Sequence, residues 1–100
     1  MMRDISVSDI VESLAGHDRG EIFAVVATDG EFLYLANGKQ RKLQKPKRKK
    51  VIHARRAFQC SSPLAEKLVS GAATDGEIRK ELAVLRDRKL TEEGKKLGKR

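Results

Sequence analysis

Two apolar segments of strand length flank the dipeptide Asp29-Gly30. Residues 22–27 read Ile-Phe-Ala-Val-Val-Ala and residues 31–36 read Glu-Phe-Leu-Tyr-Leu-Ala, so both are rich in β-branched or aromatic side chains. Asp-Gly between two such segments favours a type I′ turn, which needs positive φ at both of its central residues. The sequence therefore predicts a β-hairpin, and we expect the N-terminal half of the chain to be β-structure.

The rest of the N-terminal half also predicts short strands joined by tight turns. Further strand candidates lie at residues 5–11, 39–43 and 51–54. Asn37-Gly38 predicts a second tight turn, which would make residues 39–43 the return strand. Pro46 has no amide hydrogen to donate, so residues 44–50 are expected to form a loop or an edge. Several short strands in about fifty residues favour a small, strongly bent barrel.

The hydrophobic period changes to a helical one in the C-terminal half. Ser62-Pro63 fits an N-cap followed by proline at the first helical position, and Gly71 fits a helix end. Thr74 and Glu77 have the spacing of a capping box. A helical stripe follows, made of Ile78, Leu82 and Leu85, and it is expected to dock on a core. The predicted organisation is a barrel over 1–56, a helical appendage over 57–90 and a flexible charged tail over 91–100.

Positive charge is concentrated in one segment. Residues 39–56 contain ten Lys or Arg and no acid, whereas residues 1–38 carry a net charge of −5 and residues 57–100 a net charge of +3. A focused positive field attracts polyanions and raises their encounter rate. Nucleic acid is the expected partner. A membrane surface fits poorly, because residues 39–50 contain a proline and a single leucine instead of an amphipathic helix.

Enzymatic chemistry finds no support in the sequence. Cys60 is the only cysteine, and His17 and His53 have no metal-ligand or catalytic spacing. No glycine-rich loop with a Lys-Ser/Thr ending is present to hold a nucleotide. The N-terminus lacks the apolar core of a signal peptide. We expect a cytoplasmic, non-enzymatic protein without a cofactor.

Residues 11–26 carry a family resemblance. They contain a strand, the loop Gly16-His17-Asp18-Arg19-Gly20 and a second apolar strand, and this pattern resembles the KOW motif. The basic stretch 37–50 also resembles that of small bacterial KOW proteins related to large-subunit ribosomal proteins. The resemblance implies a mainly β fold, with an SH3-like barrel before the helices. It also implies binding of RNA, commonly ribosomal.

The candidate RNA-binding residues are the cations of the basic segment and of the motif loop. They are Lys39, Arg41, Lys42, Lys45, Lys47, Arg48, Lys49, Lys50, Arg55, Arg56, Arg19 and His17. Gly16 and Gly20 are expected to serve the turn, and Asp18 is expected to cap it by accepting hydrogen bonds from amides two residues on. Arg19 fits a phosphate contact, a base-stacking contact or a solvated turn residue.

Two further alternatives remain open from the sequence alone. Phe32 and Tyr34 share one face of a strand, where they would either stack on bases or pack into the core, and core packing is favoured in a domain this small. The barrel would bind structured RNA, or it would contact a ribosomal protein or RNA polymerase as a protein-interaction module. A solvent-exposed apolar stripe on the second helix would favour the protein-interaction reading.

Overall fold

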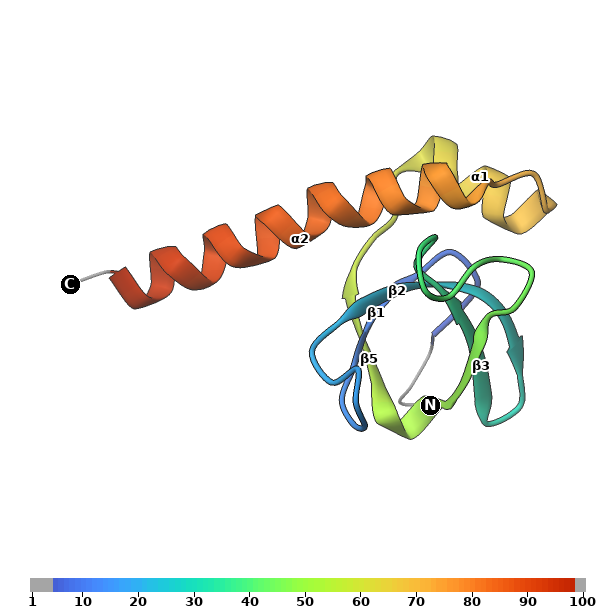
Figure 1. Ribbon diagram of the computed structural model, residues 1–100, viewed down its shortest axis with the longest axis horizontal. Coiled ribbons are helices and arrows are strands. Elements are labelled where there is room, and N and C mark those ends of the chain that lie inside the picture. Colours follow the sequence, from blue (N-terminus) through green and yellow to red (C-terminus); the bar gives the residue numbers. More distant parts are fainter. Residues whose placement is uncertain (1–4, 99–100) are drawn as a thin grey trace.

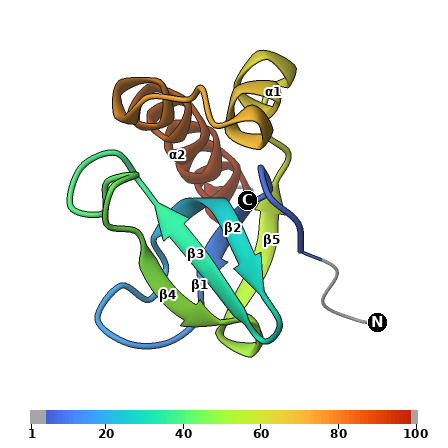
Figure 2. The same cartoon turned by 90° about the vertical axis from the view of Figure 1, so that its right-hand side faces the viewer.

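The fold is a curled five-stranded antiparallel sheet with two helices packed on one side of it (Figures 1 and 2). The computed structural model describes the backbone of residues 5–98 and the side chains of residues 5–89. In chain order the elements are β1 (Ile10–Ser13), β2 (Ile22–Asp29), β3 (Phe32–Ala36), β4 (Lys47–Lys50), a 3-10 turn (Val51–His53), β5 (Ala54–Phe58), α1 (Ser62–Ser70) and α2 (Asp75–Gly98). The strands lie in the order β4-β3-β2-β1-β5.

The predicted β-hairpin is formed by β2 and β3, with a different turn. Asp29 pairs directly with Phe32, so the two loop residues are Gly30 and Glu31. Gly30 has a φ of +60°, whereas Glu31 is not among the described residues with positive φ. Glycine with positive φ at the first loop position alone is typical of a type II′ turn. The type I′ assignment was therefore wrong, because Asp29 still belongs to the strand.

Residues 37–46 form a loop, and the predicted strand at 39–43 is wrong. The Asn37 side chain holds the loop, since its Oδ1 accepts hydrogen bonds from the amides of Lys39 and Arg41 at 2.9 and 3.0 Å. The backbone N–H of Asn37 in turn donates to the Arg41 carbonyl at 2.8 Å. These local bonds satisfy backbone groups that a strand would pair with its neighbour. The return strand is β4, which starts directly after Pro46.

The sheet curls without closing into a continuous ladder. Register shifts in the β2–β3 and β1–β5 pairs mark bulges, which bend a sheet and increase its twist. The 3-10 turn joins β4 to β5, and the His53 carbonyl accepts a hydrogen bond from the Leu14 amide at 2.8 Å. In the described chain β4 and β5 are the two edges and do not pair with each other. β5 continues to Phe58, beyond the expected boundary at residue 56.

The two helices begin, and α1 ends, close to where local chemistry predicts. The cap residue of α1 is Ser61 and not the expected Ser62, so Pro63 is the second helical residue instead of the first. Gly71 ends the helix as predicted, with a φ of +82°. The capping box of α2 is formed in both directions: Thr74 Oγ1 accepts from the Glu77 amide at 3.2 Å, and Glu77 Oε1 accepts from the Thr74 amide at 3.0 Å.

The second helix is longer than the sequence suggests. α2 continues to Gly98 through most of the segment where composition predicts a flexible tail, and residues 99–100 lie outside the described part. Lys, Glu and Leu dominate this segment and are good helix formers. The helix therefore projects beyond the sheet (Figure 1).

The buried apolar residues form two clusters, one on each face of the sheet. The cluster inside the curl contains Val11, Phe23, Val25, Leu33, Leu35 and Ala54. The other cluster joins the outer face of the sheet to the helices, and contains Ile10, Ile22, Ala24, Ala36, Leu64, Leu68, Ile78, Leu82 and Leu85. The stripe of α2 is therefore buried, as the sequence predicts, and it fixes α2 across the sheet.

Candidate nucleic-acid interface

The motif loop (residues 16–20), with its flanking residues 14, 15 and 21, joins β1 to β2 as a tight turn. Gly16 and Gly20 have φ values of +86° and +89°, in the left-handed region that glycine tolerates best. The Gly20 amide donates to the Ser13 carbonyl at 2.8 Å, and the Arg19 amide donates to the Gly16 carbonyl at 3.2 Å. His17 and Arg19 are exposed on this loop. The loop thus presents two side chains from a fixed backbone.

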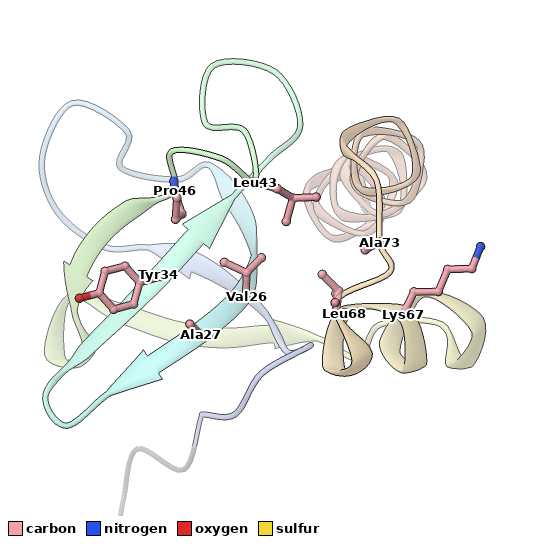
Figure 3. Close-up of a pocket in the computed structure, with 9 residues that line it drawn as sticks. Val26, Ala27, Tyr34, Leu43, Pro46, Lys67, Leu68 and Ala73 are labelled. Carbon is pink, nitrogen blue, oxygen red and sulfur yellow. The ribbon is translucent and has the colours of Figure 1, made fainter.

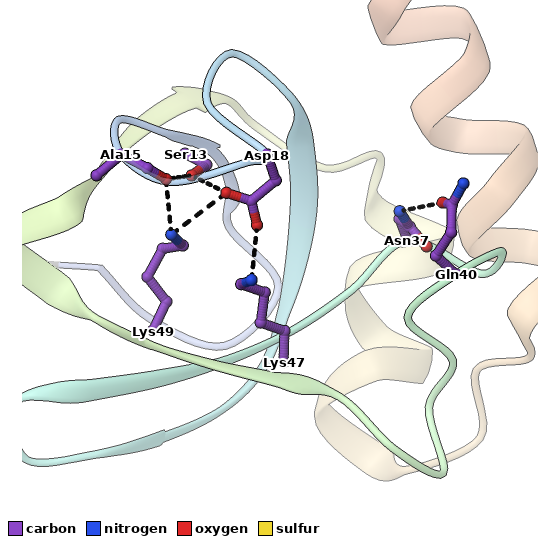
Figure 4. A network of polar contacts seen from close by, with 7 residues as sticks. All are labelled: Ser13, Ala15, Asp18, Asn37, Gln40, Lys47 and Lys49. Carbon is purple, nitrogen blue, oxygen red and sulfur yellow. Dashed lines mark hydrogen bonds and ion pairs between the residues drawn. The ribbon is translucent and has the colours of Figure 1, made fainter.

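Asp18 connects this loop to β4 (Figure 4). Its Oδ1 accepts a hydrogen bond from Ser13 Oγ at 2.6 Å and lies 3.3 Å from Lys49 Nζ, while its Oδ2 lies 3.1 Å from Lys47 Nζ. Lys49 Nζ also donates to the Ala15 carbonyl at 3.1 Å. The predicted bonds from Asp18 to nearby amides are absent from the described contacts, because the carboxylate points toward β4 instead.

These contacts stabilise the ionised form of the Asp18 carboxylate. Burial raises the pKa of Asp18, but the hydrogen bonds from Ser13 and Lys47 and the charge of Lys49 outweigh it, so the pKa lies below its ordinary value of 3.8. The carboxylate is therefore ionised at neutral pH and neutralises part of the charge on β4.

This network changes the predicted site on β4. The Lys49 side chain is only 9% exposed and its ammonium is directed at the motif loop, so it is not available to a phosphate. Lys47 remains 26% exposed beside Asp18. Arg48 and Lys50 alternate with them, are exposed, and occupy the other face of the strand.

The loop 37–46 is docked on the start of α2. The Arg79 guanidinium donates to the Gly38 carbonyl at 2.7 Å, and the Leu43 amide donates to Asp75 Oδ1 at 2.8 Å. Gly38 packs so closely that an added Cβ would lie 2.3 Å from the Asp75 carbonyl oxygen. The loop therefore has its own internal bonds and two anchors on a helix more than thirty residues away in sequence.

The structure brings most of the predicted cations together along one side of the molecule. The exposed ones are His17, Arg19, Lys39, Arg41, Lys42, Lys45, Arg48 and Lys50. In Figure 2 the motif loop and the loop 37–46 lie on the same side, with β4 between them. We call the exposed cations of these three segments the loop-side basic surface. None of them forms an ion pair with an acid in the described part of the chain.

The two arginines of β5 lie elsewhere. Figure 2 shows β5 on the opposite side of the sheet from the two loops. Arg55 forms an ion pair with Glu12 at 2.8 Å, and Arg56 lies 3.6 Å from Asp9. Both side chains keep more than half of their surface exposed, but neither joins the loop-side basic surface.

Three residues near this surface were missed or undervalued in the sequence. Arg79 borders it through Gly38, a contact that no local pattern reveals. Phe32 and Tyr34 are half-buried and face away from the inner core, so the expected core packing is only partial. The Arg48 guanidinium lies over the Phe32 ring, 4.3 Å from its centroid. Successive side chains of a β-strand point to opposite faces, so the sequence spacing of Phe32 and Tyr34 already indicated that they share one face of β3.

Comparisons with known proteins give no family. No family model matches the chain, and no curated protein matches it. Within the described residues, no group of three or more His, Cys, Asp or Glu side chains is placed to hold a metal ion. Among the described helices, none has the length and apolar character needed to span a membrane.

Proposed function

We propose that this chain is a cytoplasmic, non-enzymatic RNA-binding protein of the KOW type, acting in a ribosomal or translational setting. Its curled sheet would be an SH3-like barrel, with β4 and β5 as adjoining edges linked by the 3-10 turn. Structured RNA would bind along the loop-side basic surface. The protein would act by neutralising phosphates from a rigid frame, without reading many bases.

One observation carries this proposal: the exposed cations stand on loops whose backbones are fixed. Lys39, Arg41 and Lys42 belong to a loop that is anchored on α2, and Arg19 belongs to a loop that is tied to β4. A merely solvated lysine-rich loop has no need of such anchoring. Fixed cations lose less conformational freedom when they meet a phosphate, so binding retains more of the interaction energy.

The second helix does not support the alternative in which the chain is a protein-interaction module. A solvent-exposed stripe of Ile78, Leu82 and Leu85 would have favoured that reading, and these side chains are at most 3% exposed. The motif loop and the loop 37–46 expose their cations to a partner. Their charge favours a polyanion over a protein surface of mixed charge.

The test is the salt dependence of RNA affinity in two matched variants. Arg41→Gln with Lys42→Gln removes two charges from the loop-side basic surface, and Lys80→Gln with Arg88→Gln removes two exposed charges from α2. We expect the loop variant to reduce the slope of log K against log salt by about 2, and to weaken binding of an RNA hairpin about tenfold or more at 0.1 M salt.

The α2 variant is the control and should leave the slope nearly unchanged. A shallow slope in the wild-type protein would exclude phosphate binding as the basis of its function. Equal losses in the two variants would mean that affinity follows net charge alone and not this surface.

A further inference from the structure

A groove of about 580 Å³ opens beside the loop-side basic surface, between the sheet and α1 (Figure 3). Its lining is mainly apolar, and includes Val26, Tyr34, Leu43, Pro46, Leu68 and Ala73. The sheet supplies one wall, the C-terminal end of α1 supplies the opposite wall, and the loop 37–46 borders it. Its volume lies within the range of pockets that bind small organic groups.

An aromatic ring stands at the sheet end of this groove. Tyr34 is half-buried, and Figure 3 shows its hydroxyl directed away from the groove. In the β3–β4 ladder Tyr34 pairs with Arg48. The groove therefore has a π-surface at one end, with a guanidinium on the neighbouring strand.

Charge around the groove is positive where RNA would pass and neutral on the helix side. Leu43 and Pro46 line the groove, and the residues next to them in sequence, Lys42 and Lys45, are exposed. Lys67, on the α1 side, is already ion-paired with Glu77. No Asp or Glu lines the groove in the described chain. An occupant with a flat apolar part and a nearby negative group fits this arrangement.

We propose that the groove takes one unstacked nucleobase of a bound RNA, stacked against Tyr34, while Lys42 and Lys45 hold the adjoining phosphates. This inference rests on the proposed function and adds a preference to it: RNA with a bulged or looped nucleotide binds more tightly than a fully paired stem. Unstacked bases in loops and bulges are the ones that aromatic side chains capture in RNA. Because the lining is mostly apolar, we expect little preference among the four bases.

The experiment compares two RNA hairpins that differ only in one bulged 2-aminopurine, a base whose fluorescence depends on its stacking. We expect wild-type protein to bind the bulged hairpin about tenfold more tightly than the paired one and to change the 2-aminopurine fluorescence. Tyr34→Leu keeps the groove apolar but removes the ring, and should abolish this preference while leaving affinity for the paired hairpin unchanged. Tyr34→Phe keeps the ring and should retain the preference.

The fluorescence of the wild-type complex tests the proposal even if Tyr34→Leu is poorly folded. Equal affinity for the two hairpins with unchanged fluorescence would overturn the base site and leave phosphate binding intact. Failure to bind either hairpin would instead overturn the proposed function. A third measurement follows NMR methyl signals of Val26, Leu68 and Ala73. If they do not shift with the bulged RNA, the base site is excluded, and an apolar side chain of a protein partner becomes the better occupant.

Discussion

Replacing Gly38 by alanine tests whether the basic loop is held on α2. Gly38 has a φ of +78°, and an added Cβ would lie 2.3 Å from the Asp75 carbonyl oxygen and 3.1 Å from the Arg79 amide nitrogen. Both neighbours are backbone atoms of the first turns of a helix, so they cannot swing aside as the end of a flexible side chain can. The loop must therefore move away from α2 or the helix must shift.

The magnitude follows from two separable costs. The left-handed backbone costs an alanine about 1–2 kcal/mol. The steric conflict adds about 1–3 kcal/mol, either as strain or as loss of the Arg79–Gly38 and Leu43–Asp75 hydrogen bonds when the loop moves. Gly30→Ala isolates the first cost, because Gly30 also has positive φ but no heavy atom lies within 4 Å of its added Cβ. We expect Gly38→Ala to lower the free energy of unfolding by about 2–5 kcal/mol, and Gly30→Ala by about 1–2 kcal/mol.

Urea unfolding of the two variants and the wild type measures these values directly. RNA affinity of the folded fraction provides the functional readout, and we expect it to fall for Gly38→Ala and to stay unchanged for Gly30→Ala. If the two variants differ by less than about 0.5 kcal/mol, the loop is not packed on α2 as described. If Gly38→Ala is destabilised but binds RNA as well as wild type does, loop order does not contribute to binding.

Two further predictions concern titratable groups. The folded-state pKa of Asp18 is lowered, so its contribution to stability is present above its ordinary pKa of 3.8 and is lost as the pH falls through the folded-state pKa. Asp18→Asn should therefore lower the free energy of unfolding by about 1–3 kcal/mol at neutral pH, and a difference that does not shrink in acid would contradict this. Burial, helped by the charge of Glu81, raises the pKa of the Cys60 thiol from 9.0 to about 11. Iodoacetamide should alkylate Cys60 roughly 100-fold more slowly in the folded protein than in urea at pH 8, and equal rates would contradict that burial.

Features set by neighbours in sequence were predictable. The β2–β3 hairpin follows from a glycine between two apolar strands, and the end of α1 follows from Gly71 with its left-handed φ. The capping box at Thr74 forms with the predicted partners. In each case the deciding contacts span only a few residues, so local propensity and tertiary structure agree.

The loop 37–46 was not predictable in the same way. Asn37-Gly38 after a strand is a hairpin signal, and residues 39–43 were read as the return strand. The Asn37 side chain forms a wider loop instead, and that loop is stabilised by Asp75 and Arg79. Those two partners belong to a helix whose position depends on the packing of its buried stripe. No pattern within the loop carries that information.

The number of cations in β4 does not indicate how many of them are available to bind RNA. In sequence the four cations of β4 are equivalent, because residues 44–50 were expected to form a loop or an edge; the alternation of Lys47 and Lys49 with Arg48 and Lys50 appears in the structure. What the sequence lacks is the position of Asp18, which engages the first pair and leaves the second pair exposed. Reversing all four charges would therefore disrupt the contact between the motif loop and β4 as well as any RNA contact. Substitutions that separate RNA binding from folding therefore belong on the cations outside this network, which lie on the loop 37–46, on the outer face of β4, and at His17 and Arg19 of the motif loop.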